Sequence, residues 1–412
     1  MQINNKILNR NNFIIFFFLF LILNYLFFNY RILARENGYI LGDWVFNYSG
    51  GFGNRGFFGH IFYSLSLYSS ISIVNIIFLF SSIIYITSIY WFYSIIKNRL
   101  NNNLIFIFTL LPSTFLFNFF DPLTVGRKEI LVLFFFTFYY LNIDKIDFFL
   151  KYKIITLIAF ITIILTHEII FFFIPYLFIL KFLYKENVSR FKFSDYLFEF
   201  LILFTGVLII FVILKTNHLR DYEVLCNSLL NINLTKNSCW AINDFAGDIN
   251  FRFIYHYFLE KNYFKNYFLY FILTTAPLIL LIIQSQNKYK KKFILLSILS
   301  LFFSFSFFLQ VNDWGRYLNI IFLIQFLTIL LFTKNDEIVN INKYNIFYLI
   351  KLLIIFFYLV SWHMPHCCNP KLGKGYISIY DRILMRIKDN SIESTKYRDL
   401  PRMYLRKLFK ID

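Results

Sequence analysis

The chain has 412 residues, of which 58% are hydrophobic, 23% are aromatic and only 16% are charged, and its mean hydropathy is +0.60. This composition excludes an ordinary soluble globular protein. The net charge of +18 does not indicate nucleic-acid binding, because most lysines and arginines stand beside long apolar runs, where they act as orientation signals for membrane insertion. The sequence therefore predicts an integral membrane protein.

Long apolar runs recur along residues 1–364. A helix needs about 20 apolar residues to cross a hydrocarbon core of about 30 Å, so we expect an all-α fold, a polytopic membrane bundle of about eleven transmembrane helices, several of them short. The first run follows Lys6 and Arg10 and lacks a cleavage site behind it, which favours a retained span over a signal peptide. The predicted spans are 13–33, 71–95, 103–120, 130–142, 154–166, 169–184, 196–215, 266–286, 293–310, 319–333 and 346–363.

The apolar run 154–184 decides the predicted topology. As one helix it would measure about 46 Å at about 1.5 Å per residue. It would also put His167 and Glu168 near the middle of the membrane, where charge is costly. Two helices that meet at this pair avoid both problems. With the N-terminus in the cytoplasm, the short inside segments then carry most of the basic residues, in agreement with the positive-inside rule.

The polar segments between the spans predict three further features. Residues 57–68 alternate polar and apolar residues at helical spacing, which predicts a helix in the membrane interface after the first span. Residues 216–265 form an extracytoplasmic insertion with Cys226 and Cys239, and a disulfide between them stays open because it needs an oxidising compartment. Residues 365–412 form a basic, polar C-terminal tail whose side of the membrane is also left open.

Acidic and basic residues gather in four short segments that all fall on the predicted outside, and charge at a membrane face indicates a site. Asp43 is the first candidate, because a carboxylate can act as general base for a sugar hydroxyl. A helix cap or a solvated loop position is the simpler alternative. The four segments contain Glu36/Asp43/Arg55, Asp121/Arg127/Lys128/Glu129, His167/Glu168 and Asp313/Trp314/Arg316.

The cations of these segments are candidate phosphate ligands. Arg55 lies in the glycine-rich run 50–56, and its guanidinium fork matches phosphate oxygens, although a lipid headgroup would also suit it. Arg127 and Lys128 stand on the face where the orientation rule disfavours cations, so a bound diphosphate would explain them. Glu129 beside them has a structural interpretation, because acidic residues favour a helix start.

The remaining candidates have competing interpretations. His167 with Glu168 could transfer protons, bind a divalent cation or cap two helix ends. Arg316 is either a further phosphate ligand or the partner of Asp313. A zinc site is not expected, because the chain has neither a CxxC pair nor the His-Glu-x-x-His arrangement. The one group of metal-ligand types, His363, His366, Cys367 and Cys368, is irregularly spaced.

An acidic residue in the first outside segment, further acids and arginines in later ones, and many spans resemble the membrane glycosyltransferases of the GT-C class and bacterial O-antigen or capsule polymerases. The resemblance is one of architecture over residues 1–364. It implies a glycosyltransferase that moves a hexosyl unit from a polyprenyl-(di)phosphate-linked sugar on the extracytoplasmic face of the bacterial inner membrane. Its partners would be the polyprenyl-linked glycan and membrane lipid, and its process cell-surface polysaccharide assembly.

The resemblance also implies roles for the candidates. No cofactor is certain, and a divalent cation stays open. The alternative is a lipid-linked glycan flippase or another multi-span transporter, whose polar residues should line the membrane centre. The centres of the predicted spans are nearly free of charge. The implied catalytic residues are Asp43, Asp121 and Glu168, and the implied substrate or phosphate ligands are Arg55, Arg127, Lys128, Arg316, His167, Trp44 and Trp314.

Overall fold

In the residues that the computed structural model describes, the regular elements are helices. The predicted tail 365–412, with His366, Cys367 and Cys368, lies outside the described residues, as do residues 217–218, 240–241 and 243–262 of the insertion 216–265 and most of the last predicted span, 346–363. The structure describes residues 2–100, 102–186, 192–216, 219–239, 242, 263–284, 290–308, 313–332, 354–355, 357–359 and 361–364.

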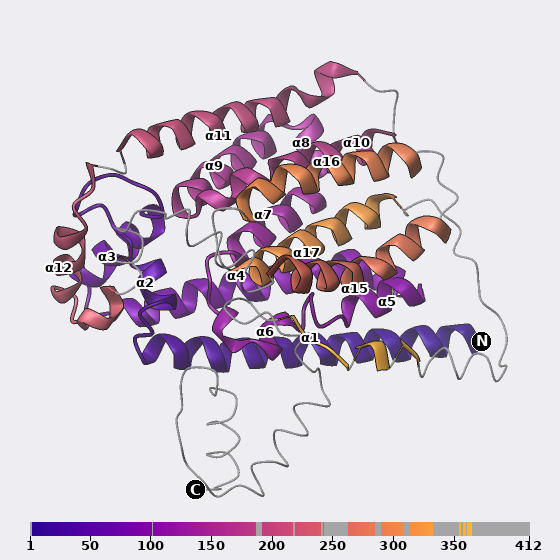
Figure 1. Cartoon of the computed structure of the whole chain (residues 1–412), viewed down its shortest axis with the longest axis horizontal. Coiled ribbons are helices and arrows are strands. Elements are labelled where there is room, and N and C mark those ends of the chain that lie inside the picture. Colours follow the sequence, from indigo (N-terminus) through magenta and orange to yellow (C-terminus); the bar gives the residue numbers. More distant parts are fainter. Residues whose placement is uncertain are drawn as a thin grey trace, which may run out of the picture.

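The helices range from a single turn to the 33 residues of the first one. Figure 1 shows the long helices lying roughly along the long axis of the molecule. In chain order the elements, with η for 3-10 helices, are α1 (Gln2–Ala34), α2 (Ile40–Trp44), α3 (Phe57–Tyr68), α4 (Ile73–Ile96), η1 (Lys97–Arg99), α5 (Asn103–Thr109), α6 (Phe117–Phe120), η2 (Pro122–Thr124), α7 (Ile130–Leu141), α8 (Ile143–Phe148), α9 (Leu150–Thr166), η3 (Glu168–Phe173), α10 (Ile174–Glu186), η4 (Phe193–Tyr196), α11 (Leu197–Thr216), α12 (Tyr222–Leu230), η6 (Lys236–Cys239), α15 (Tyr263–Gln284), α16 (Lys290–Phe308) and α17 (Trp314–Phe332).

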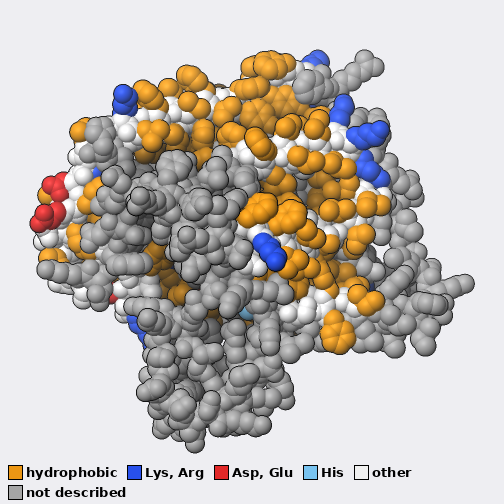
Figure 2. Space-filling model, in the orientation of Figure 1, with side chains coloured by type: hydrophobic (Ala, Val, Ile, Leu, Met, Phe, Trp, Pro, Cys, Tyr) orange, Lys and Arg blue, Asp and Glu red, His pale blue; other side chains and the backbone are white. Residues whose placement is uncertain are grey.

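Four helical stretches of the described chain are long and apolar enough to cross a membrane, which indicates a membrane protein. On the face in Figure 2, apolar side chains cover a broad band, and several basic side chains gather at its right-hand edge. Other predicted spans are helical but short, such as α7 with 12 residues and α10 with 13. Eleven crossings therefore stay a prediction. The four stretches are Arg10–Ala34, Ile73–Arg99, Phe193–Thr216 and Trp314–Leu331.

The predicted span 103–120 is wrong as a single helix. The segment divides into α5 and α6, with Pro112 in the turn between them. Proline has no backbone N–H and disfavours a helical conformation in the residue before it. The Thr114 hydroxyl donates to the carbonyls of Phe108 and Leu111, 3.0 Å in each case, and so satisfies groups that the break releases.

Two other sequence-based predictions are confirmed. The helix at 57–68 coincides with α3, although its place in an interface stays a prediction. The run 154–184 divides at His167, whose backbone is extended between α9 and η3, with φ −156° and ψ 100°. Two predicted loops contain helix instead, because α2 includes Asp43 and α17 begins before Arg316.

Side-chain hydrogen bonds show which polar segments lie together at each of the two ends of the bundle. At one end Arg10 Nη2 donates to Asn103 Oδ1, 2.8 Å, and Arg99 Nη1 donates to the carbonyl of Leu330, 2.5 Å. At the other end the Tyr39 hydroxyl donates to Asp313 Oδ2, 2.6 Å. The start of α1 therefore lies with the ends of α4 and α17, and the end of α1 lies with the start of α17.

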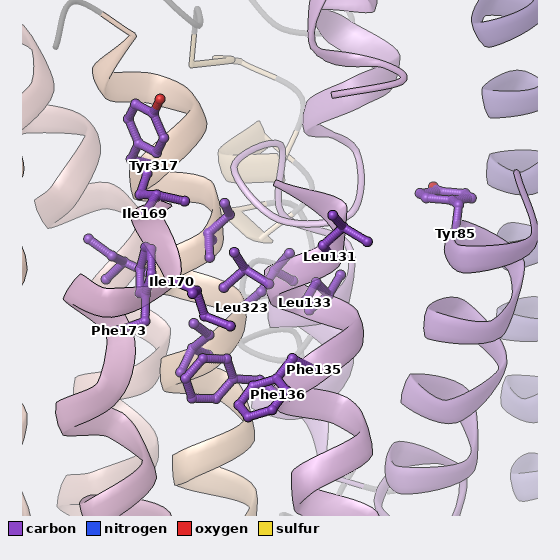
Figure 3. Close-up of a cluster of buried hydrophobic side chains, with 14 of the residues drawn as sticks. Tyr85, Leu131, Leu133, Phe135, Phe136, Ile169, Ile170, Phe173, Tyr317 and Leu323 are labelled. Atoms are coloured by element: carbon purple, nitrogen blue, oxygen red, sulfur yellow. The ribbon is translucent and has the colours of Figure 1, made fainter. Parts of the chain in front are cut away.

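A buried apolar cluster holds the starts of α7, η3 and α17 together, as Figure 3 shows. These starts carry the charged residues at 127–129, 167–168 and 313–316, so the core beneath them places three distant segments side by side. The cluster includes Leu131, Leu133, Phe135 and Phe136 from α7, Ile169, Ile170 and Phe173 from η3, and Leu323 from α17.

Candidate functional site

Arg55 joins two of the predicted acids. Its backbone is left-handed, with φ +61°, which costs a non-glycine residue about 1 kcal/mol. Its side chain makes contacts that offset this cost. Nε and Nη2 each donate to Glu168 Oε1, 3.0 Å, and Nη1 donates to Asp43 Oδ1, 3.2 Å. One guanidinium thus holds carboxylates from two separate segments.

Lys128 also contacts the segments that carry Arg55, Asp43 and Glu168. Its side chain is fully buried, and its ammonium donates to the carbonyls of Arg55, 2.9 Å, and Thr166, 3.3 Å. The ammonium also lies 3.9 Å from Asp43 Oδ1. Burial lowers the pKa of Lys128 to about 8, and the Asp43 carboxylate only partly opposes that effect. Through its two hydrogen bonds to backbone carbonyls, the buried lysine holds the Arg55 loop against the end of α9.

The lowered pKa of Lys128 predicts how stability depends on pH. The penalty for a charged, buried lysine is fully present below pH 8, and it is relieved between about 8 and the ordinary value of 10.5, because there the unfolded chain binds more protons. At about 1.4 kcal/mol per pKa unit, the wild type should gain up to about 3 kcal/mol over this window relative to Lys128→Met. Thermal melting of both proteins in detergent at pH 7 to 10 measures this difference. Parallel pH profiles would contradict the prediction.

His167 lies between two carboxylates. Nε2 is 3.7 Å from Glu129 Oε1, and Nδ1 is 4.0 Å from Glu168 Oε2, both longer than a hydrogen bond. Within the described residues, neither ring nitrogen has a hydrogen-bond partner. Burial lowers the pKa of His167, but the flanking carboxylates outweigh burial and raise it above the ordinary value. The ring is therefore poised to hold a proton.

Arg316 and Arg127 complete the arrangement. Arg316 Nη1 lies 2.6 Å from Glu129 Oε1, and Nη2 donates to Asp313 Oδ2. Asp313 also accepts from the Tyr39 hydroxyl, 2.6 Å. Arg127 stacks on the Tyr39 ring, 3.8 Å from its centroid, and donates to the Tyr39 carbonyl, 3.1 Å. The starts of α7 and α17 are therefore joined to the segment after α1.

These contacts form one network of opposite charges, which we call the ion network. Most members are buried, but the side chains of Arg55 and Glu168 are 11% and 24% exposed. Tyr39 is also only half-buried, and we call the Arg55–Glu168 pair the exposed edge of the network. The network comprises the acids Asp43, Glu129, Glu168 and Asp313, the cations Arg55, Arg127, Lys128 and Arg316, and His167 and Tyr39.

The ion network thus includes seven of the ten predicted site residues and leaves out three, although the centroid of the Trp44 ring lies 5.7 Å from the Lys128 ammonium. Asp121 is half-buried after α6, where its carbonyl accepts from the Thr124 amide and hydroxyl, and the contacts that define the ion network do not include it. Trp44 is buried and donates to the Gly126 carbonyl, 2.5 Å. Trp314 is buried beside Tyr267. Both indoles therefore pack in the interior, a position that favours a structural role over sugar stacking.

Sequence reasoning missed Tyr39 and Glu129 as members of the ion network, and it missed Arg220, which supports the network from outside. Tyr39 carried no signal, and the helix-start interpretation of Glu129 hid its pairing with Arg316. Arg220 is buried and donates to the carbonyls of Asn47, 2.7 Å, and Asn54, 2.8 Å, so it holds the loop that carries Arg55. Arg220, like Arg127, is a cation on the predicted outside, where the positive-inside rule disfavours cations. The same signal could therefore have identified Arg220.

Segment 219–239 packs against the loop that carries Arg55 and supports it. The Asp221 amide donates to the Gly50 carbonyl, 2.7 Å, and a Cβ at Gly50 would lie 1.9 Å from the Asp221 carbonyl oxygen, so glycine is required there. The structure pairs Cys226 with Cys239, with their Cα atoms 5.5 Å apart. The pairing that the sequence left open is therefore made, and it stiffens this segment.

A divalent cation finds little support in this geometry. Within the described ranges, no group of three or more His, Cys, Asp or Glu side chains is placed to hold a metal ion. Asp43 and Glu168 face Arg55 instead, which neutralises the charge that a cation would need.

Comparisons with protein-family models, curated proteins and solved structures each found no match.

Proposed function

We propose that the chain is an integral membrane glycosyltransferase or polysaccharide polymerase, which uses polyprenyl-(di)phosphate-linked sugars on the extracytoplasmic face in cell-surface polysaccharide assembly. The observation that carries the proposal is the Arg55–Glu168 pair at the exposed edge of a buried ion network. A guanidinium binds and stabilises a departing diphosphate. A carboxylate beside it accepts the proton of an acceptor hydroxyl.

Glu168 suits the role of general base better than Asp43. Asp43 is 4% exposed and lies between Arg55 and Lys128. Neighbouring cations outweigh burial and lower the pKa of Asp43 and of Glu168 alike, so the choice between the two carboxylates rests on access, and the Glu168 side chain is 24% exposed. In this assignment Asp43 and Lys128 hold Arg55 in position, and Glu168 meets the acceptor. Tyr48 and Phe52, stacked with centroids 5.1 Å apart in the same loop, offer aromatic surface for a sugar, since Phe52 is 40% exposed.

The proposed topology has eleven spans, a cytoplasmic N-terminus and the ion network outside a bacterial inner membrane. In a background of Cys367→Ser and Cys368→Ser, an impermeant maleimide should label Ser49→Cys in intact cells and label Asn98→Cys only after lysis. Both positions are exposed and belong to opposite ends of the bundle. Labelling of Asn98→Cys in intact cells, with Ser49→Cys protected, would reverse the orientation.

The function is tested by Glu168→Gln. The amide keeps an oxygen that accepts from Arg55 but loses the basicity, so the fold should persist while glycan extension falls about 10²- to 10⁴-fold. Gels of surface polysaccharide from the host cell measure the extension. Glu223→Gln, an exposed position on α12 outside the ion network, is the matched control. Unchanged long chains would remove the proposal, whereas lipid-linked units accumulating in the cytoplasmic leaflet would indicate the flippase alternative.

A further inference from the structure

Three titratable side chains stand in series behind the exposed edge of the ion network, and the last of them, Glu129, is 9% exposed. The Glu168 side chain is 24% exposed, and that of His167, behind it, is only 2% exposed. Glu129 follows on the far side of the imidazole. The two gaps, 4.0 and 3.7 Å, exceed an ordinary hydrogen bond of about 3.0 Å by no more than about 1 Å. Such contacts are often long before substrate binds and shorten in the working complex.

The inner end of this series meets a cavity of about 60 Å³ between α1, α4, α7 and α17. Glu129 lines it, and within the described residues its buried Oε2 has no hydrogen-bond partner, while Oε1 pairs with Arg316. One water needs about 10–15 Å³ of such space, so the cavity has room for several. Its polar lining also includes Thr114, Asn118, Thr124, Arg127, Arg316 and Asn319.

We propose, building on the proposed function, that Glu168, His167 and Glu129 form a proton relay that carries the acceptor's proton from the exposed edge to water in this cavity. During transfer the acceptor O–H bond breaks and its oxygen bonds to the anomeric carbon. The bond from that carbon to the diphosphate oxygen breaks, and its electron pair leaves with the lipid diphosphate. The released proton passes from Glu168 to Nδ1 of His167, while Nε2 delivers a proton to Glu129 and on to water.

The surrounding charges favour a proton on His167 over either carboxylate. Burial would raise the pKa of Glu129, but Arg316 and His167 outweigh burial and lower it, so the proton does not stay on Glu129. Burial would raise the pKa of Glu168, but Arg55 and His167 outweigh burial and lower it, so the proton does not stay on Glu168. Glu129 and Glu168 favour the imidazolium, and Arg55 disfavours it. Asp43 also interacts with His167, and Lys128 lies behind Asp43. His167 is therefore the member on which the proton rests in transit.

The relay is tested first by histidine NMR on the full chain in lipid nanodiscs. The chain has six histidines, and His167→Gln identifies the signal of interest by its loss. We expect that signal to titrate with a pKa above the ordinary value, and to shift downward in both Glu129→Gln and Glu168→Gln. His60→Gln is the control, because His60 lies on α3 beside Tyr48 and outside the series. A signal that does not titrate, or that responds to only one carboxylate, would overturn the relay.

A second measurement links the relay to transfer. Membrane vesicles from the host cell carry their own lipid-linked units, and His167→Gln should extend them at least about 100-fold more slowly than the wild type. The variant should also lose the acid limb of the pH–rate profile, which a merely structural histidine would leave in place. Equal extension by wild type and Glu168→Gln rejects the proposed function and the link of the relay to transfer, whereas the titration alone decides whether His167 holds a proton between the two carboxylates.

Discussion

Arg55→Ala should produce no detectable long-chain glycan and should unfold at a lower temperature than the wild type. The substitution removes the guanidinium that holds Asp43 and Glu168. Loss of one partner from a buried ion pair costs about 3–5 kcal/mol, and loss of one stabilising donor at a reacting group costs about 10²–10³ in rate. The single substitution therefore lowers both the stability and the transfer rate. Polysaccharide gels and thermal melting in detergent measure them separately.

Two further variants sharpen this result. Arg55→Lys keeps the charge but has no fork to serve two carboxylates, so it should recover stability more than activity. Arg35→Ala removes the same charge from an exposed position at the same end of the bundle, and it should behave as the wild type. Full-length glycan from Arg55→Ala would show that the pair at the edge of the ion network takes no part in transfer.

The sequence predicted the helical class and the His167 break for a physical reason. Long apolar runs have few alternatives to a membrane helix, and a charged pair is too costly in the middle of one. The division of 103–120 was also signalled, by Pro112, but the apolar count outweighed it. Helix starts were predicted too late where polar residues precede the apolar run: α1 begins at Gln2 instead of 13, and α17 at Trp314 instead of 319.

The pairing of charges could not be predicted in the same way. Composition shows that Arg55, Arg127 and Arg316 need negative partners, and a diphosphate and a protein carboxylate satisfy that need equally. The partner depends on contacts such as Tyr39 with Asp313, 274 residues apart. The structure supplies carboxylates for Arg55 and Arg316 and an aromatic face for Arg127. Pairing therefore does not single out one arginine, and the proposed role of Arg55 as substrate ligand rests on its position at the exposed edge.

Asp43→Asn should destabilise the protein by about 3–5 kcal/mol, because it leaves the buried Lys128 and Arg55 without their shared carboxylate. Glycan extension should fall with the folded fraction. This loss alone does not separate a base from a residue that positions Arg55, since both assignments predict it. Removing Lys128 together with the Asp43 carboxylate separates the two assignments.

The double variant Asp43→Asn/Lys128→Met removes both charges and leaves Arg55 paired with Glu168. Replacing both partners of a buried pair is far less damaging than removing one, so melting should recover most of the loss, short of the two carbonyl hydrogen bonds of Lys128. If Glu168 is the base, glycan extension should return with the fold, to within about tenfold of the wild type. Glu168→Gln/Lys128→Met should fold and stay inactive. A stable but inactive Asp43→Asn/Lys128→Met protein would instead return the role of base to Asp43.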